Sequence, residues 1–337
     1  MVLDADEAAL CRFSRRWRGI AHTACWWNLT VPTAQIEAQA KVNLFLRILG
    51  REASGYHQLE TLFQRISLAD QIVVRTDVAG QSLECSGADV GPVEQNLAWR
   101  AALAFRAAAG WPNSFAIEVT KNIPVGGGLG GGSADAGGVL RAFNALAPSK
   151  LSDEHLFGVA RTLGADVPFL ASTAPTALGI VRGDVIVACP PPPIRDLILL
   201  VPPFAISSAD AFGWYAAAHA DAPRKQSRMT SPTSGIAPAR IYAGRTAIAE
   251  QPYSWREIAA LAGNDLQDVA VERHPEIARA IAVLRAAGSP FVQMTGSGST
   301  IFGVFPNRPT GGVIAIPEGF TALHAQTLTK VADVAVS

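Results

Sequence analysis

The densest cluster of glycines is the segment from Gly126 to Gly132, in which six of seven residues are glycine. Glycine costs conformational entropy on folding but lets the backbone turn sharply and approach a ligand closely. A helix predicted to start at Ser133 would direct free N–H groups and its positive dipole end toward a di- or triphosphate. The alternative is a flexible linker, which would not require Pro124 or Leu129. The segment therefore predicts a phosphate-binding loop.

Two well-known phosphate loops fit this segment poorly. The Walker pattern GxxxxGK[ST] is excluded because no lysine precedes Ser133. The pattern GxGxxG can be read through Gly126, Gly128 and Gly131, but a run of glycines matches almost any such template. The phosphate loop is therefore of another kind.

Five other side chains are candidates for chemistry or binding. Asp166, as an ionised carboxylate, could take a proton from a hydroxyl; the alternative is a helix-terminal aspartate that caps whatever follows Gly164. Lys41 lies among apolar residues of a predicted strand, where a cation needs a partner; the alternative is an exposed strand face. Asn43 shares the face of Lys41 because strand side chains alternate. Tyr56 and His57 lie in a turn-like stretch, where exposed aromatic side chains often bind ligands.

Predicted strands and helices follow one another irregularly, which favours an α+β fold over a doubly wound sheet. Asn96 and Ser152 are helix-capping residue types, and Gly110 and Gly164 are typical helix ends. Alternating apolar residues predict strands at residues 38–49, 71–75, 115–119, 197–201, 291–294 and 301–305. Helices are predicted at residues 97–110, 133–147, 152–164 and 275–288.

The order of these elements suggests an extension and two domains. Residues 1–33 are rich in arginine and lack a periodic apolar face, which favours an N-terminal extension. Four prolines at 190–193 cannot continue a helix or an inner strand and predict a boundary between domains at 34–190 and 194–337. The basic segment 221–250 is interpreted as a solvated loop; the alternative is a lid that contacts phosphate.

The composition excludes several classes of partner. The 337 residues include 28 Lys+Arg and 28 Asp+Glu, so the formal net charge is zero, which argues against binding to nucleic acid or an anionic membrane surface. No apolar run reaches the ~20 residues that span a bilayer. Four widely spaced cysteines without a CxxC pair argue against a structural zinc site and indicate a reducing compartment, so we predict a cytoplasmic protein.

Five segments together resemble a known superfamily. Pro124, three residues, then Gly128-Leu129-Gly130 and a helix is similar to the central motif of the GHMP small-molecule kinases. Within that superfamily, residues 38–46, 55–64, 164–169 and 294–299 resemble segments of the kinases that act on 4-diphosphocytidyl-2-C-methyl-D-erythritol. The resemblance spans residues 38–305, and the Gly-Tyr-His block is its most specific part.

The resemblance implies a two-domain α+β fold with a ribosomal-protein-S5-domain-2-like N-terminal domain and a ferredoxin-like C-terminal domain. It also implies ATP and Mg²⁺ as cofactors, and Asp166 as the group that deprotonates the substrate hydroxyl, paired with Lys41. The residues it places around ATP are Pro124, Val125, Gly126, Gly127, Gly128, Leu129, Gly130, Gly131, Gly132, Ser133, Ala134, Gly296, Ser297 and Gly298.

The same resemblance implies how the second substrate binds. Tyr56 would stack on the cytosine ring and His57 would form hydrogen bonds to its edge, with Asn43 reaching the same cavity. Residues 206–212 are similar to a family segment in which Phe212 would be a second aromatic wall and Ser208 a hydroxyl near the diphosphate. Two residues depart from the family pattern, Gln39 in place of proline and Ala134 in place of a second serine.

Two other functions are compatible with part of this pattern. Another GHMP kinase, acting on mevalonate, homoserine or a sugar, would keep the glycine segments but would not need Tyr56 and His57. A nucleotide-binding relative without turnover would not need both Lys41 and Asp166. The presence of all four residues favours the cytidyl substrate.

Overall fold

The computed structural model describes residues 31–52, 55–220, 253–308 and 314–337. Residues Val31–Ser337 form one compact unit. The predicted loop over 221–250 lies outside the described residues, as does the predicted extension up to residue 30. In the described part of the chain, no helix is both long and apolar enough to cross a membrane.

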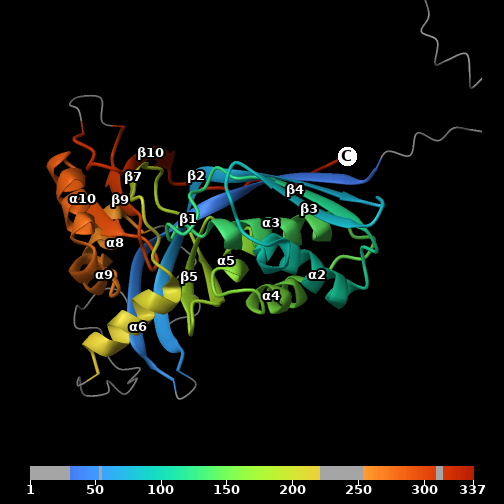
Figure 1. Ribbon diagram of the computed structural model, residues 1–337, viewed down its shortest axis with the longest axis horizontal. Coiled ribbons are helices and arrows are strands. Elements are labelled where there is room, and N and C mark those ends of the chain that lie inside the picture. The colour runs from blue at the N-terminus through green and yellow to red at the C-terminus, as the bar shows by residue number, and fades with distance from the viewer. Residues whose placement is uncertain (1–30, 53–54, 221–252, 309–313) are drawn as a thin grey trace, which may run out of the picture. The chain divides into compact units, whose positions relative to one another are not determined.

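The N-terminal half of the described chain forms most of a seven-stranded sheet (Figure 1). Its strand order is β11-β1-β2-β4-β3, with β5 paired to β2 and β6 paired to β5. All pairs are antiparallel except β3 and β4. The strands are β1 (Thr33–Arg51), β2 (His57–Thr76), β3 (Gln81–Ser86), β4 (Phe115–Thr120), β5 (Thr176–Ile180), β6 (Val185–Cys189) and β11 (Ala335–Val336).

The two longest strands extend well beyond their predicted bounds. β1 begins at Thr33 because Ala34, Ile36 and Ala38 continue its buried face, although alanine is a weak strand former. The ladder between β1 and β2 has three register shifts, at 39/41, 43/45 and 48/50. Such irregularities re-aim side chains, and two of them flank residues 41–43.

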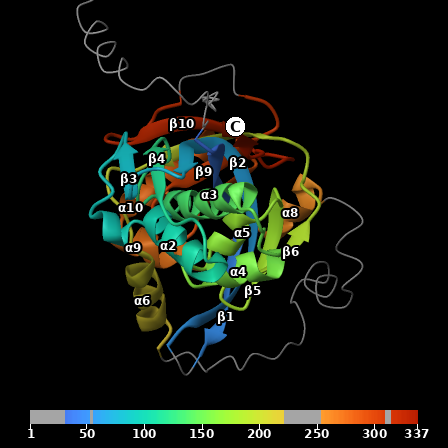
Figure 2. The same cartoon turned by 90° about the vertical axis from the view of Figure 1, so that its right-hand side faces the viewer.

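Helices cover one face of this sheet (Figure 2). α2 follows the cap residue Asn96, whose side chain accepts a hydrogen bond from the backbone N–H of Ala98 (2.8 Å), and ends before Gly110, as predicted. α3 begins two residues earlier than predicted, α4 ends three residues before Gly164, and α5 was not predicted. The helices are α2 (Leu97–Ala109), α3 (Gly131–Leu146), α4 (Asp153–Arg161) and α5 (Val167–Ala171), with a 3-10 turn at Val93–Gln95.

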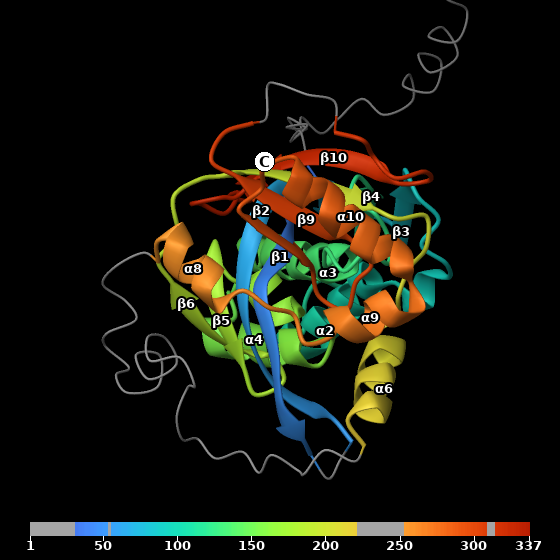
Figure 3. The same cartoon turned by 90° about the vertical axis from the view of Figure 1, so that its left-hand side faces the viewer.

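The second sheet has four antiparallel strands in the order β10-β7-β9-β8. α10 and α9 lie against it in Figure 3, and Ile277, Leu284 and Ile301 share its core. The strands are β7 (Asp196–Val201), β8 (Phe291–Met294), β9 (Ile301–Phe305) and β10 (Thr321–Gln326). The helices are α6 (Ser208–Ala218), α8 (Trp255–Leu261), α9 (Gln267–Arg273) and α10 (Pro275–Ala286).

The α+β prediction is confirmed. The proline run 190–193 connects β6 of the first sheet to β7 of the second, while β11 returns to pair with β1. An isolated bridge between Leu46 of β1 and Asn264 joins the first sheet to the connection between α8 and α9. The domain bounds 34–190 and 194–337 stay a prediction.

Candidate active site

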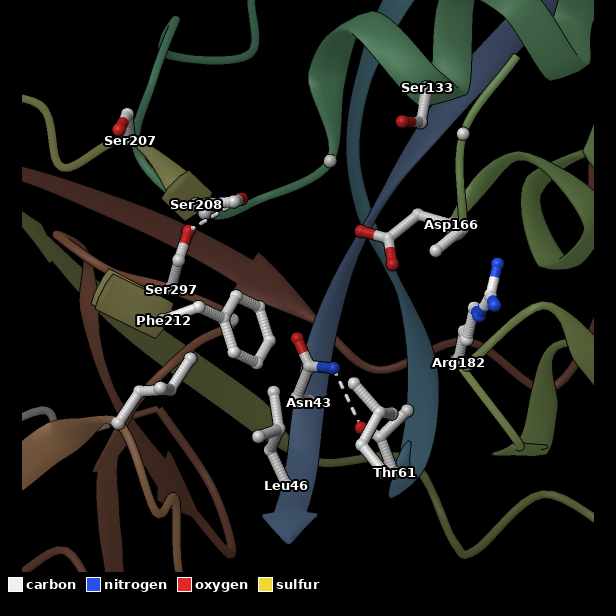
Figure 4. A pocket seen from close by; sticks show the side chains of 18 of the residues that line it. Asn43, Leu46, Thr61, Ser133, Asp166, Arg182, Ser207, Ser208, Phe212 and Ser297 are labelled. Atoms are coloured by element: carbon white, nitrogen blue, oxygen red, sulfur yellow. Dashed lines mark hydrogen bonds between the residues drawn. The ribbon is translucent and has the colours of Figure 1, made fainter. Parts of the chain in front are cut away.

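A pocket of about 1060 Å³ collects residues from β1, β2, the glycine loop, α3, α6 and the β8–β9 turn (Figure 4). Most predicted site residues line it. They are Lys41, Asn43, Tyr56, His57, Pro124, Gly126, Gly127, Gly128, Leu129, Gly130, Gly131, Gly132, Ser133, Asp166, Ser208, Phe212, Gly296 and Ser297. Three others, Val125, Ala134 and Gly298, are not among its lining residues.

The glycine loop closes one end of this pocket and leads directly into α3. The backbone N–H of Lys41 donates to the Leu129 carbonyl (3.0 Å), which ties the loop to β1. A Cβ at Gly128 would lie 2.4 Å from the Thr295 carbonyl oxygen, so only glycine allows the loop to contact the second glycine segment. The first N–H groups of α3 have no partner within the helix, so this end of the helix is suited to binding an anion.

Lys41 is the buried cation of the site, with 3% of its side chain exposed. Its Nζ lies 3.2 Å from Asp166 Oδ2, 2.7 Å from Asn43 Oδ1 and 2.9 Å from the Gly128 carbonyl oxygen. An ammonium group has three donors, so these three oxygens satisfy it. The pairing of Lys41 with Asp166 is confirmed, and the exposed-face alternative is wrong.

Asp166 occupies the position before α5, but its side chain caps nothing. It makes no capping hydrogen bond, so the interpretation as a helix cap is wrong. The side chain is 31% exposed, and Figure 4 shows its carboxylate between Ser133 and Asn43. The carboxylate is therefore held by one buried cation and open to a ligand on its other side.

Arg65 holds the C-terminal end of α5 and was not among the predicted site residues. It is 1% exposed, and its Nη2 donates to the carbonyl oxygens of Phe169 (2.9 Å), Leu170 (3.0 Å) and Ser172 (2.9 Å). A cation at a helix C-terminus satisfies carbonyls that lack partners. Burial lowers the pKa of Arg65 to about 9, so the guanidinium stays charged at neutral pH. This arginine fixes the short helix that carries Asp166.

Two threonines orient Asn43 and were also missed. Asn43 Nδ2 donates to Thr61 Oγ1 (2.7 Å), which in turn donates to the Phe45 carbonyl (2.7 Å). The backbone N–H of Asn43 donates to Thr295 Oγ1 (3.1 Å) in the turn after β8. Asn43 thus has its oxygen fixed toward Lys41 and its amide nitrogen toward Thr61. Thr61 lies in the segment 55–64, which is part of the resemblance. That segment could therefore have indicated Thr61 as a site residue.

Aromatic side chains gather at the other end of the pocket. The His57 ring stacks on Phe212 with centroids 5.1 Å apart and planes at 21°, and Tyr215 meets His57 edge-on at 6.2 Å. Burial, with a smaller effect of Arg51, lowers the pKa of His57, which favours the neutral form of its ring. A neutral imidazole both donates and accepts a hydrogen bond, which suits recognition of a base edge.

A serine pair lies beside this aromatic group. Ser208 Oγ and Ser297 Oγ are 3.2 Å apart, and they join the start of α6 to the β8–β9 turn. Figure 4 shows both next to Phe212. Both serines line the pocket.

Beneath the glycine loop, a buried cluster consists of Asp70, Lys121 and Asp135. Lys121 Nζ bridges the two carboxylates, and Asp70 Oδ1 accepts the backbone N–H of Asn122 and of Ile123, where the loop begins. Asp135 Oδ1 has no hydrogen-bond partner in the described structure. Burial disfavours the charged form of Asp135. The single ammonium group of Lys121 is shared with Asp70, so its attraction does not offset the effect of burial, and the pKa of Asp135 rises to about 7.

This cluster predicts a specific dependence of stability on pH. The folded state holds a proton on Asp135 more tightly than the unfolded state, so its stabilising contribution is present below pH ~4 and is lost as pH rises through about 7. We expect the free energy of unfolding of Asp135→Asn to fall less than that of wild type between these pH values. Urea unfolding across this range measures it, with exposed Asp153→Asn as control. Equal slopes for Asp135→Asn and wild type would contradict the assignment.

Comparison with known proteins shows the family to which the chain belongs. Residues 96–173 match the family model of the GHMP kinases N terminal domain, and residues 247–315 match that of the GHMP kinases C terminal. The 4-diphosphocytidyl-2-C-methyl-D-erythritol kinase of Desulfotalea psychrophila is 39% identical over 80% of this chain and 85% of the relative. The enzyme of that name from Moorella thermoacetica is 38% identical over 85% and 93%. The chain belongs to the family of 4-diphosphocytidyl-2-C-methyl-D-erythritol kinases.

Solved structures place this family in a wider fold group. A crystal structure of 4-(cytidine 5'-diphospho)-2C-methyl-D-erythritol kinase matches with 31% identity and a TM-score of 0.64, covering 87% of this chain and 98% of that one. Homoserine kinase from Cytophaga hutchinsonii matches with a TM-score of 0.61 at 16% identity, over 93% and 99%. The second likeness concerns the fold alone. The predicted GHMP kinase fold is confirmed.

Proposed function

We propose that this chain transfers the γ-phosphoryl of ATP to the 2-hydroxyl of 4-diphosphocytidyl-2-C-methyl-D-erythritol, giving the 2-phosphate and ADP. This reaction would serve the non-mevalonate route to isoprenoid precursors in the cytoplasm. The observation that carries the proposal is the pair of Lys41 and Asp166, 3.2 Å apart, in one pocket with a phosphate loop and an aromatic end. The identity of the substrate is inferred from the names of the related kinases.

The site residues divide the work of phosphoryl transfer, which needs positioning and charge stabilisation more than covalent chemistry. Backbone N–H groups of the glycine loop and the N-terminus of α3 would hold the ATP phosphates. Asp166 would orient the substrate hydroxyl and accept its proton on a carboxylate oxygen. Lys41 would keep that carboxylate ionised and supply positive charge near the transferring group.

The residues around Asp166 also fit a magnesium ion. Mg²⁺ prefers oxygen ligands and is usually bound by one or two carboxylates together with substrate phosphates and water. Asp166 and the Ser133 hydroxyl both line the pocket beside the loop, so they would hold it. Among the described residues, no group of three acidic, histidine or cysteine side chains that could hold a metal ion is found. When bound, the ion neutralises charge on the phosphate oxygens.

Cytosine recognition would come from the aromatic end. Tyr56 is 61% exposed and lines the pocket, so its ring is available for stacking. The neutral ring of His57 would form hydrogen bonds with the base edge, and Phe212 would be the second wall. Ser208 and Asn43 would contact the diphosphate and the sugar alcohol. These roles separate this family from GHMP kinases whose substrates lack a base.

Removal of the Tyr56 ring should affect the two substrates differently. Stacking of a base on an aromatic side chain contributes about 1–3 kcal/mol, so Tyr56→Ala should raise KM for the cytidyl substrate about 5- to 150-fold. KM for ATP should stay close to that of wild type. Steady-state kinetics with each substrate varied in turn measures both, and Tyr56→Phe, which keeps the ring, is the control. Equal rises in both KM values would contradict stacking.

A direct assay tests the proposed function. Purified protein with ATP and Mg²⁺ should phosphorylate 4-diphosphocytidyl-2-C-methyl-D-erythritol, detected by ADP release and by the mass of the product. Mevalonate, homoserine and a simple sugar are the comparison substrates. Phosphorylation of one of these, with the cytidyl compound unchanged, would refute the assignment.

A further inference from the structure

Arg182 is a pocket residue that the mechanism above does not use. It lies in the turn between β5 and β6, and Figure 4 shows it on the side of the pocket opposite to Phe212. Its Nε donates to Glu52 Oε1 (3.3 Å) and its Nη2 to Glu52 Oε2, a two-point contact with one carboxylate. Such a fork fixes the plane of the guanidinium as well as its position. Arg182 is therefore a held cation rather than a free surface arginine.

The guanidinium is held against a ring that the proposed function needs. Its Cζ lies 4.3 Å from the centre of the Tyr56 ring. This distance is typical of a cation–π contact, for which the planar guanidinium is well suited. In the described structure Tyr56 is 61% exposed, and its ring contacts the Arg182 guanidinium.

The backbone around Tyr56 is fixed separately from its ring. The Glu52 N–H donates to the Tyr56 carbonyl (2.8 Å), and Gly55 provides the left-handed conformation, with φ of +90°, that the turn requires. The Leu59 N–H donates to the Val181 carbonyl (2.8 Å), which joins this hairpin to the turn that carries Arg182. These backbone contacts do not involve the Arg182 side chain. The contact of that side chain with Tyr56 therefore restrains the ring and not the backbone.

We propose that Arg182, oriented by Glu52, holds the Tyr56 ring as the platform on which the pyrimidine base stacks. Arg182 is then a positioning residue that strengthens recognition of the base without touching the reacting atoms. The ordering of the ring occurs in the free protein, so less conformational entropy is lost on binding. This inference rests on the proposed function, because it assigns a base to the pocket.

The competing explanation is that Arg182 only attracts an anionic substrate by its charge. The two explanations differ for Glu52→Ala, which makes the pocket more positive but releases the guanidinium. Attraction by charge predicts tighter binding by this variant, whereas the platform predicts weaker binding. They also differ for Arg182→Lys, which keeps the charge and loses the planar stack.

Calorimetric titration with cytidine 5'-diphosphate tests the platform, with ADP as the control nucleotide. We expect the Kd for cytidine 5'-diphosphate to rise about two- to fivefold in Arg182→Gln, in Arg182→Lys and in Glu52→Ala, with the Kd for ADP unchanged. In the Tyr56→Ala background, Arg182→Gln should have no further effect. In the kinase assay, KM for the cytidyl substrate should rise by the same factor at nearly constant kcat.

The matched control is Arg75→Gln, which removes another arginine–glutamate pair, with Glu118, on strands β2 and β4. It should change none of these values. Wild-type affinity in Arg182→Lys, tighter binding in Glu52→Ala, or an undiminished effect in the Tyr56→Ala background would each overturn the platform. Failure of wild type to bind cytidine 5'-diphosphate would instead refute the proposed function, and the inference with it.

Discussion

Asp166→Asn is expected to lower kcat by about two to four orders of magnitude, the range typical of a general base. The amide keeps the size of the side chain but cannot accept the proton of the substrate hydroxyl. Asp166 is part of the pocket wall rather than of the glycine loop, so the loop and the N-terminus of α3 should still bind ATP. A small change in the Kd for ATP should accompany the loss of turnover.

Single-turnover kinetics and ATP titration measure these two effects. Asp153→Asn is the matched control, because Asp153 is an exposed aspartate in the first turn of α4 and does not line the pocket. It should behave like wild type. If Asp166→Asn keeps more than about a tenth of the wild-type kcat, the proton has another acceptor, since a general base contributes at least ~10²-fold.

Lys41→Met is expected to lower kcat by about 10²- to 10³-fold, as when one preorganised donor to a developing charge is removed. Methionine preserves the unbranched shape, but three oxygens lose their cationic partner, on Asp166, Asn43 and Gly128. The variant should also unfold at a lower temperature, because buried acceptors without donors cost free energy. KM for ATP should rise as well, since Lys41 holds the Gly128 carbonyl of the loop.

The control for this substitution is Lys150→Met, at an exposed lysine outside the pocket. Steady-state kinetics and thermal unfolding of both variants separate the loss of catalysis from the loss of stability. Near-normal kcat in Lys41→Met, with only the unfolding temperature lowered, would show that this cation is structural. Addition of small alkylamines should partly restore turnover if the missing group is the ammonium itself.

Local features of the fold, such as helix starts and short strands, could be predicted from residues that are close together in the sequence. Asn96, Ser152 and Pro275 mark helix starts, because capping and fixed φ angles act within one turn of the chain. The strands at 291–294 and 301–305 followed from short apolar runs around a glycine turn. α5 escaped prediction because its five residues carry no periodic pattern, and its position depends on Arg65.

The candidate site likewise has features that could be predicted from the sequence and features that could not. The types of chemical group present and the loop that can approach phosphate could be predicted from the sequence alone, because these depend on residue identity and local backbone freedom. The pairing of Lys41 with Asp166 came from a resemblance, and the geometry of the pocket then confirmed it.

Which distant groups meet depends on the tertiary structure. The Arg182 contact with Tyr56 and the buried group of Asp70, Lys121 and Asp135 join segments that are separate in the chain. Sheet order, register shifts and burial determine such contacts, and no local pattern encodes them. The physical reason is that the cost of burying a charge is set by the partners that the fold brings to it.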